Sequence, residues 1–420
     1  MIQPRTIALA LLLLIPFTFF AQQLQETPPP YNIKTVSFIQ SGENVYPYFR
    51  LGDSFQLAFD DLFGNEANYY YSIVHCNYDW TPSTQLSVND YLDGFDTQRI
   101  QTYENSFNTL QIYSRYQLAF PNKFSTIKIT GNYMLNILNE DREVVFSRRF
   151  IMYQDQVSVP VQVKRARDMD AIQQRHNLDF SIKTNNFNFQ SPLQNVKVAL
   201  FQNGRFDNAI YNVKPQYTIG NDLIYKYNKE TQFWAGNEYL YFDNKDVRNA
   251  VGNILRITAK DIYETILYTS DARASKGYTY FPDKNGNFYT RNINLSVTNQ
   301  NLESDYTWVF FKLSAPEFYE KKDIYVGGMF NNYAKTDEYR LEYDEKTATY
   351  NKAIMMKQGF NNYMYITADK SGKVDGEHAV DGNYYQTEDD YNIFVYYRQN
   401  NERYDRVIGR GNANSQDIIN

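Results

Sequence analysis

Apolar and polar residues alternate with a period of two along most of the chain after residue 30. In the stretch Tyr69–Tyr78, Ile73 and His75 fall on one side of an extended chain, and Val74 and Cys76 fall on the other. This pattern predicts an interior strand of a first β-sheet domain. We expect Val74 and Cys76 to face the core of that domain.

Similar short runs recur down the chain and predict further strands, separated by turn residues such as Gly52-Asp53, Gly64-Asn65 and Pro121-Asn122. The predicted strands are 33–39, 46–50, 54–59, 69–78, 113–120, 125–138, 144–152, 176–183, 195–202, 207–213, 223–227, 239–242, 253–258, 305–312, 323–327, 339–343, 349–355, 362–367 and 391–398. Short strands with turns at this spacing are typical of antiparallel sandwiches.

The length of 420 residues fits about three such domains. The predicted fold is all-β, with tandem antiparallel immunoglobulin-like β-sandwiches at 31–153, 161–260 and 261–410 and a polar tail at 411–420. Tyr and Phe number 39 and 29, and this aromatic surplus favours pleated sheets over helices.

Two asparagine-glycine pairs, Asn203-Gly204 and Asn285-Gly286, predict hairpin turns. The polar and aromatic insert at 81–108 interrupts the strand pattern, and a short helix is expected within it at 97–107. Long loops of this kind often carry function.

The N-terminus has Arg5 as its charged residue, followed by an uncharged, mostly apolar run from Ile7 to Phe20. The run is shorter than the ~20 residues that a membrane-spanning helix needs. Residues 1–21 therefore predict a secretory signal peptide. Residues 22–30 form a leader that ends in three prolines, and the mature chain is expected to be exported.

Reactive side chains are few. The single cysteine, Cys76, follows His75 directly, and neighbours in a strand point to opposite faces, so the pair does not predict a catalytic dyad. The three histidines have no metal-site spacing, and we expect no metal and no cofactor. The net charge of −6 without a basic cluster excludes nucleic acid as an expected partner.

Two acidic pairs, Asp60-Asp61 and Asp389-Asp390, are expected to be solvated turns. A glycoside hydrolase would need two acids brought together from different strands, which a sequence does not reveal, so this class stays open as an alternative.

The run Val326–Tyr333, followed by Gly359–Tyr365, resembles the strand-turn-strand pattern of starch-binding immunoglobulin-like modules. The resemblance leaves an exported carbohydrate-binding protein as a second alternative. Aromatic residues at these positions also fit a sandwich core.

A further resemblance extends over the whole mature chain. The segment Gly382–Arg398, followed by Arg403–Gly409, resembles the C-terminal signature of the type IX secretion system plug family of Bacteroidota. The opening Ile33–Phe38, the strand Tyr71–Trp80 and the turn Gly327–Tyr333 are similar to that family and occur in its order. Asp389-Asp390 departs from the Glu-Asn expected there.

The resemblance implies a non-enzymatic protein of the periplasm, at the inner face of the outer membrane, that closes the periplasmic mouth of the giant translocon barrel. No small-molecule substrate is expected. The predicted barrel contacts lie in the residues that lead into the insert, in the insert itself and in the 330–333 turn. They are Tyr78, Trp80, Tyr91, Phe95, Phe330, Asn331, Asn332 and Tyr333.

Overall fold

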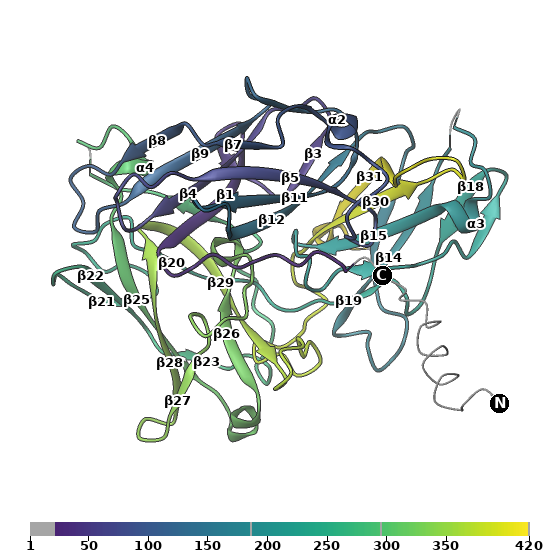
Figure 1. Cartoon of the computed structure of the whole chain (residues 1–420). Helices are drawn as coiled ribbons and strands as arrows, with labels where there is room; N and C mark the ends of the chain where they lie inside the picture. The colour runs from purple at the N-terminus through teal and green to yellow at the C-terminus, as the bar shows by residue number, and fades with distance from the viewer. Residues whose placement is uncertain (1–21, 185–186, 295, 419–420) are drawn as a thin grey trace, which may run out of the picture.

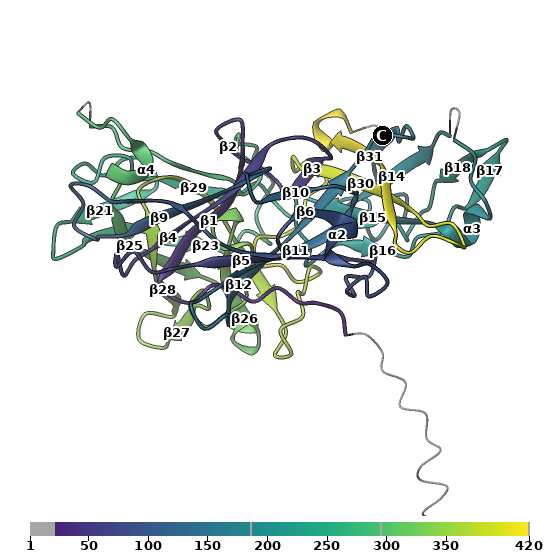
Figure 2. The same ribbon diagram turned by 45° about the horizontal axis from the view of Figure 1, so that its top comes forward.

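The structure, a computed structural model, describes residues 22–184, 187–294 and 296–418. The predicted signal peptide lies outside the described residues. The molecule is elongated and built of three regions (Figures 1 and 2). The first region (31–153) lies across the top of Figure 1. The second (157–235 with 389–418) forms one end, and the third (237–388) forms the other end and the underside.

The first region consists of two five-stranded sheets packed around one apolar core. In spatial order, one sheet is β2 (Glu43–Asn44), β1 (Ile33–Gln40), β4 (Phe55–Asp61), β9 (Ser114–Phe120) and β8 (Thr102–Asn105), and the other is β3 (Tyr48–Arg50), β12 (Val144–Tyr153), β11 (Gly131–Leu138), β5 (Tyr70–Cys76) and β7 (Thr97–Arg99). Strands β10 (Ser125–Ile127) and β6 (Leu92–Gly94) pair in a small two-stranded sheet. The short helix α2 (Val88–Tyr91) directly precedes β6.

Strand β5 is an interior strand, as predicted, and its successive side chains point to opposite faces of the sheet. Tyr71 and Ile73 enter the core of the first region. Cys76 and Val74 instead join a second apolar cluster with Phe201 and other side chains of the second region. The expectation that Cys76 faces the core of the first domain is therefore wrong. That face is buried because the second region packs against it.

The insert contains no helix at 97–107, and that prediction is wrong. Its residues form the edge strands β7 and β8 instead. β7 pairs with β5, and β8 pairs with β9, so the insert extends both sheets of the first region.

The second region also has two sheets around an apolar core. One is β13 (Val161–Arg165), β14 (Arg175–Ile182), β18 (Asp222–Tyr225) and β17 (Tyr217–Ile219), with β19 (Gln232–Trp234) also paired to β14, and the other is β16 (Ile210–Tyr211), β15 (Val196–Gln202), β30 (Asp390–Tyr397) and β31 (Arg406–Asn414). The short helices are α3 (Pro192–Asn195) and the 3-10 turn η3 (Ser415–Asp417).

The third region encloses a third core between two further sheets. One contains β20 (Leu240–Asp243), β29 (Gly359–Ala368), β24 (Phe288–Thr290) and β26 (Asp323–Gly327), and the other contains β21 (Ile254–Thr258), β22 (Tyr263–Leu267), β25 (Tyr306–Ser314), β28 (Thr349–Lys357), β27 (Glu342–Asp344) and β23 (Ser270–Asp271). Its short helices are α4 (Gln300–Glu303), η1 (Glu317–Lys321) and η2 (Met329–Asn331).

The strand pairing differs from the predicted domain division in two places. Strand β30 pairs with β15 of the second region and β31 pairs with β30, although the sequence predicts residues 261–410 as one C-terminal domain. Strand β20 pairs with β29 of the third region, although it falls within the predicted second domain at 161–260. The chain therefore crosses between the second and third regions more than once.

The predicted turns are present, with one difference in pairing. Asn203 and Gly204 both have positive φ and join the antiparallel strands β15 and β16, which confirms that hairpin. Asn285 and Gly286 also have positive φ, but the following strand β24 pairs with β29 and forms no hairpin with residues 278–280.

The all-β class with mainly antiparallel sheets is confirmed. The immunoglobulin-like topology of each domain stays a prediction. Within the described residues, no helix has the length and apolar character needed to cross a membrane.

Candidate functional site

The three regions meet around a group of side chains that we call the junction. Its members are Trp80, Arg148 and Arg149 from the first region, Phe206 and Asp207 from the second, and Asn332 and Tyr333 from the third. The leader residue Glu26 lies among them. Its carboxylate accepts hydrogen bonds from the Arg149 backbone N–H (2.6 Å) and from Asn332 Nδ2 (2.7 Å).

Tyr78 and Trp80 are buried where the first region packs on the second. The Tyr78 hydroxyl donates to the Val198 carbonyl and accepts from the Asn212 N–H, both at 2.7 Å. The Trp80 indole packs edge-on against Phe206, and the Arg149 guanidinium lies 4.6 Å from its ring centre. These two residues therefore hold the two regions together.

The 330–333 turn is also structural. Asn331 accepts from the backbone N–H groups of Gly328 and Tyr333, both at 3.1 Å, and donates to the Val326 carbonyl. The Tyr333 side chain is 4% exposed, its hydroxyl contacts that of Tyr239, and Arg205 lies 4.5 Å from its ring centre. A sugar-binding platform needs an exposed ring, so this geometry does not favour glycan binding through Tyr333.

The remaining predicted contacts differ in exposure. Tyr91 is buried in the first core, and its hydroxyl donates to the Ile73 carbonyl. Phe95 is 64% exposed. The structure brings Trp80, Asn332 and Tyr333 to the junction and leaves Tyr91 and Phe95 elsewhere. Of the eight predicted contacts, Phe95 is exposed, Phe330 and Asn332 are half-buried, and the other five are buried. Contact with a partner stays a prediction.

His75 and Cys76 do not form a reactive pair. The His75 ring lies within hydrogen-bond distance of Ser83 Oγ (2.8 Å) and the Thr130 carbonyl (3.2 Å), and it is 1% exposed. Burial lowers the pKa of His75 to about 4 and raises the pKa of the Cys76 thiol to about 12. A protonated thiol that points away from a neutral imidazole has no means of activation.

Asp60 joins the first region to the third through a buried group of charges. Its carboxylate accepts from Arg115 Nη1 (2.8 Å), Lys357 Nζ (2.5 Å) and the Tyr306 hydroxyl (2.7 Å). Burial acts to raise the pKa of Asp60, but the charges of Lys357 and Arg115 outweigh it and hold this pKa below its usual value. The prediction of a solvated turn at Asp60-Asp61 is wrong, because both residues are fully buried.

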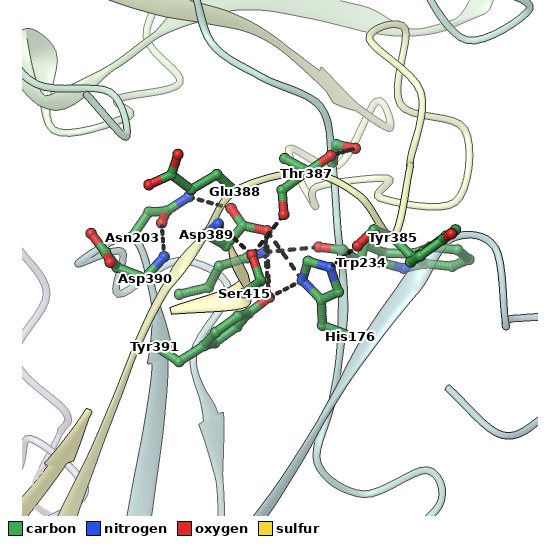
Figure 3. Close-up of polar contacts among 12 residues, drawn as sticks. His176, Asn203, Trp234, Tyr385, Thr387, Glu388, Asp389, Asp390, Tyr391 and Ser415 are labelled. Carbon is green, nitrogen blue, oxygen red and sulfur yellow. Dashed lines mark hydrogen bonds and ion pairs between the residues drawn. The ribbon is translucent and has the colours of Figure 1, made fainter. Parts of the chain in front are cut away.

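A second buried polar group surrounds Asp389 in the second region (Figure 3). The Asp389 carboxylate accepts from Asn203 Nδ2 (2.6 Å) and Gln202 Nε2 (3.0 Å), and lies 3.4 Å from His176 Nδ1. The two ring nitrogens of His176 are taken up by the Tyr391 hydroxyl and the Tyr385 carbonyl, each at 2.7 Å.

Ser415 stands beside these residues but does not complete a hydrolytic triad. Its hydroxyl donates to the Thr387 carbonyl (2.7 Å) and accepts from the Asp389 N–H (2.8 Å), and no bond to His176 is formed (Figure 3). A nucleophile requires a base within hydrogen-bond reach. The group therefore serves to fix the start of β30.

Asp390 links all three regions. Its carboxylate accepts from the Tyr46 hydroxyl of the first region (3.2 Å), from Asn414 Nδ2 of the second (2.8 Å) and from Asn285 Nδ2 of the third (2.9 Å). The solvated turn predicted for Asp389-Asp390 is therefore wrong as well. These two acids lie within the family-like segment Gly382–Arg398.

Sequence reasoning missed Glu26, Arg148 and Arg149, which form the centre of the junction. The local signal is weak, since the three consecutive prolines that end the leader indicate only an extended spacer. Among the residues that the structure describes, no group of three or more His, Cys, Asp or Glu side chains is arranged to hold a metal ion.

Residues 33–154 match the family model for the first domain of the type 9 secretion system plug protein, which is the first region described above. The whole fold is similar to the crystal structure of a hypothetical protein from Parabacteroides merdae. The two share 31% sequence identity and a TM-score of 0.87, over 94% of this chain and 100% of that one. No curated protein matches the chain. From the domain match and the full-length structural relative, we conclude that the chain belongs to the type 9 secretion system plug protein family.

Proposed function

We propose that this chain is a non-enzymatic plug of the periplasm that binds and occludes the periplasmic opening of the outer-membrane translocon barrel. The observation that carries the proposal is the match of residues 33–154 to the first domain of the plug family. A barrel wide enough to pass folded proteins leaks solutes when idle, so a folded stopper is needed at its mouth.

The contacts between the regions support this role, because a stopper has to resist deformation. Buried bonds join the first region to the third through Asp60 and Lys357, and to the second through Tyr78 and Val198. Separation of the regions would break these bonds and expose the shared apolar cluster around Trp80 and Phe201 to water, which is unfavourable. We therefore propose that the three regions move as one body.

Among the exposed apolar side chains of the first region, two features are our candidates for barrel contact. One is Phe95 in the insert. The other is a patch of Tyr31, Phe63 and Ile112, which are 68%, 50% and 57% exposed. The rings of Tyr31 and Phe63 meet edge to face at 5.8 Å, and Ile112 packs beside Gly64. Exposed aromatic clusters of this kind are typical of protein interfaces.

Purification of the translocon from cells that express a tagged form of this chain tests the proposal. The chain should co-purify with the barrel, and addition of the pure chain to barrels in a planar bilayer should lower their conductance. Absence of the chain from every barrel preparation, together with unchanged conductance, would overturn the plug role.

Surface variants separate the contact sites from the role itself. Phe95→Asp and Phe63→Asp should each weaken co-purification, while Val144→Asp, at a residue 46% exposed on β12, serves as the matched control. If the wild-type chain binds and both variants bind equally well, the plug role stands and these contact sites are refuted.

A further inference from the structure

The leader, residues 24–29, lies extended along the outer edge of β12. The Ser147 N–H donates to the Thr27 carbonyl (3.0 Å), and the Thr27 N–H donates to Ser147 Oγ (2.7 Å). Strand β3 pairs with the next part of the same edge, at residues 151–153. The leader thus continues along an edge whose backbone groups would otherwise lack partners.

Alternate leader residues face the protein. Leu24 and Glu26 are half-buried, whereas Gln25 and Thr27 are exposed. Leu24 packs against the apolar cluster that contains Trp80, and its N–H donates to the Trp80 carbonyl (2.9 Å). This is the period of a peptide bound by strand addition, in which every second side chain enters a pocket.

The pocket for Glu26 is built for a carboxylate. One oxygen is held by the Arg149 N–H and the other by Asn332 Nδ2. The guanidinium groups of Arg148 and Arg149 lie beside it in residues that are 6% and 9% exposed. Arg149 Nη2 donates to the Leu24 carbonyl, Arg148 Nη1 donates to the Ser147 carbonyl (3.1 Å), and Arg149 Nε has no hydrogen-bond partner in the described part of the chain. The charges of both buried arginines act on Glu26, the one acid of this segment.

The groove opens into a cleft of about 310 Å³ that Pro28 and Pro29 line on the leader side. Lys335 stands on the opposite wall, 3.3 Å from Asp207. The cleft leaves room beside the leader, so an incoming segment can approach without separation of the three regions.

We propose that this groove, bounded by Trp80, the β12 edge at Ser147–Arg149 and Asn332, is a binding site for an extended acidic peptide. The leader occupies the groove as an intramolecular ligand. The preferred ligand has an apolar side chain two residues before a glutamate, as in Leu24-Gln-Glu26, and belongs to another protein chain. The proposal goes beyond the plug role and does not depend on it.

The leader is covalently attached to the protein, so it competes with any external segment for the groove. A ligand tethered by a short linker has an effective concentration on the order of millimolar, so an external segment binds well only when the leader is weakened or the segment binds more tightly. Binding of a partner segment would displace the leader, so the position of the leader would depend on whether the partner is bound.

The test uses the mature chain from Gln22 and a fluorescein-labelled peptide of residues 22–30, with binding followed by fluorescence anisotropy. A chain with Leu24→Ala and Glu26→Ala should bind the peptide at least tenfold more tightly than the wild-type chain, whose own leader competes. A peptide with Gln in place of Glu26 should bind that variant at least tenfold more weakly. Thr27→Ala, at an exposed leader position whose bonds to Ser147 are made by the backbone, is the matched control and should behave as wild type.

Three results would overturn the proposal: no peptide binding by the folded double variant, equal binding by wild type and variant, or equal binding of the Glu and Gln peptides. Circular dichroism and a thermal melt establish that the variant is folded. If the double variant does not fold, the single variant Glu26→Gln, which changes one atom of the contact, gives the same comparison. Failure of its folded form to bind the peptide also overturns the proposal.

Discussion

Replacement of Asp60 by asparagine removes the carboxylate shared by Arg115 and Lys357, whose side chains are each 3% exposed. Breaking a buried ion pair by loss of one partner costs about 3–5 kcal/mol, because the other charge stays buried without compensation. Asparagine keeps one acceptor oxygen for Tyr306 or Arg115. We therefore expect Asp60→Asn to lower the free energy of unfolding by about 4 kcal/mol near pH 6, a large part of a typical total of ~5–15 kcal/mol.

The loss should depend on pH through Lys357. Burial lowers the pKa of Lys357 to about 8, against the raising effect of Asp60. Without Asp60 this pKa falls further, so the folded variant releases the proton at a lower pH while the unfolded chain retains it. Where the unfolded state binds more protons, stability rises with pH. The free energy of unfolding of the variant starts to rise at a lower pH than that of wild type. The difference between the two free energies should therefore shrink as pH rises from 6 to 8.

Urea unfolding followed by circular dichroism and tryptophan fluorescence, at pH 6 and pH 9, measures both effects. Asp61→Asn is the matched control, since the neighbouring carboxylate accepts from the neutral donors Asn32 Nδ2, the Phe63 N–H and the Tyr69 hydroxyl. We expect it to cost about 1–2 kcal/mol. The reasoning is refuted if Asp60→Asn costs no more than Asp61→Asn, or if its cost is the same at both pH values.

Three further predictions concern single buried groups. Because burial lowers the pKa of His75 to about 4, the stability of the chain should fall by up to about 3 kcal/mol as pH drops from 6.5 to 4, and His75→Gln should flatten this dependence in urea titrations at pH 7 and 4.5. Cys76→Ser places a hydroxyl in an apolar cluster and should cost about 1–3 kcal/mol while leaving co-purification with the translocon unchanged; a variant of wild-type stability that loses co-purification would contradict this. Burial raises the pKa of Glu238 to about 7, so stability should be lost as pH rises from 4.5 through 7, and Glu238→Gln should have a higher melting temperature than wild type at pH 8 but not at pH 4.5.

Local pattern was sufficient to place β5 and to separate its faces. An extended chain directs successive side chains to opposite sides, so the assignment of Ile73 and Cys76 to different faces follows from the sequence alone. The turn at Asn203-Gly204 follows in the same way, because those residues tolerate the positive φ that a tight hairpin needs. The aromatic β-rich composition and the family-like motifs gave the fold class and the family.

Only the tertiary structure decided what each face and each acid contacts. Both faces of β5 are apolar, and nothing local distinguishes a face that packs within one region from a face that packs against another. The pairing of β15 with β30 joins residues nearly two hundred positions apart, and the burial of Asp60 depends on Lys357 from the third region. Two adjacent carboxylates in a sequence suggest a solvated turn. The cations and amides that bind them in the buried state come from distant parts of the chain, which the local sequence does not show. The sequence by itself determined strands, parity, turns and family, because these depend on neighbouring residues. The regions' packing, the buried charges and the leader's groove were decided by contacts between segments far apart in the chain.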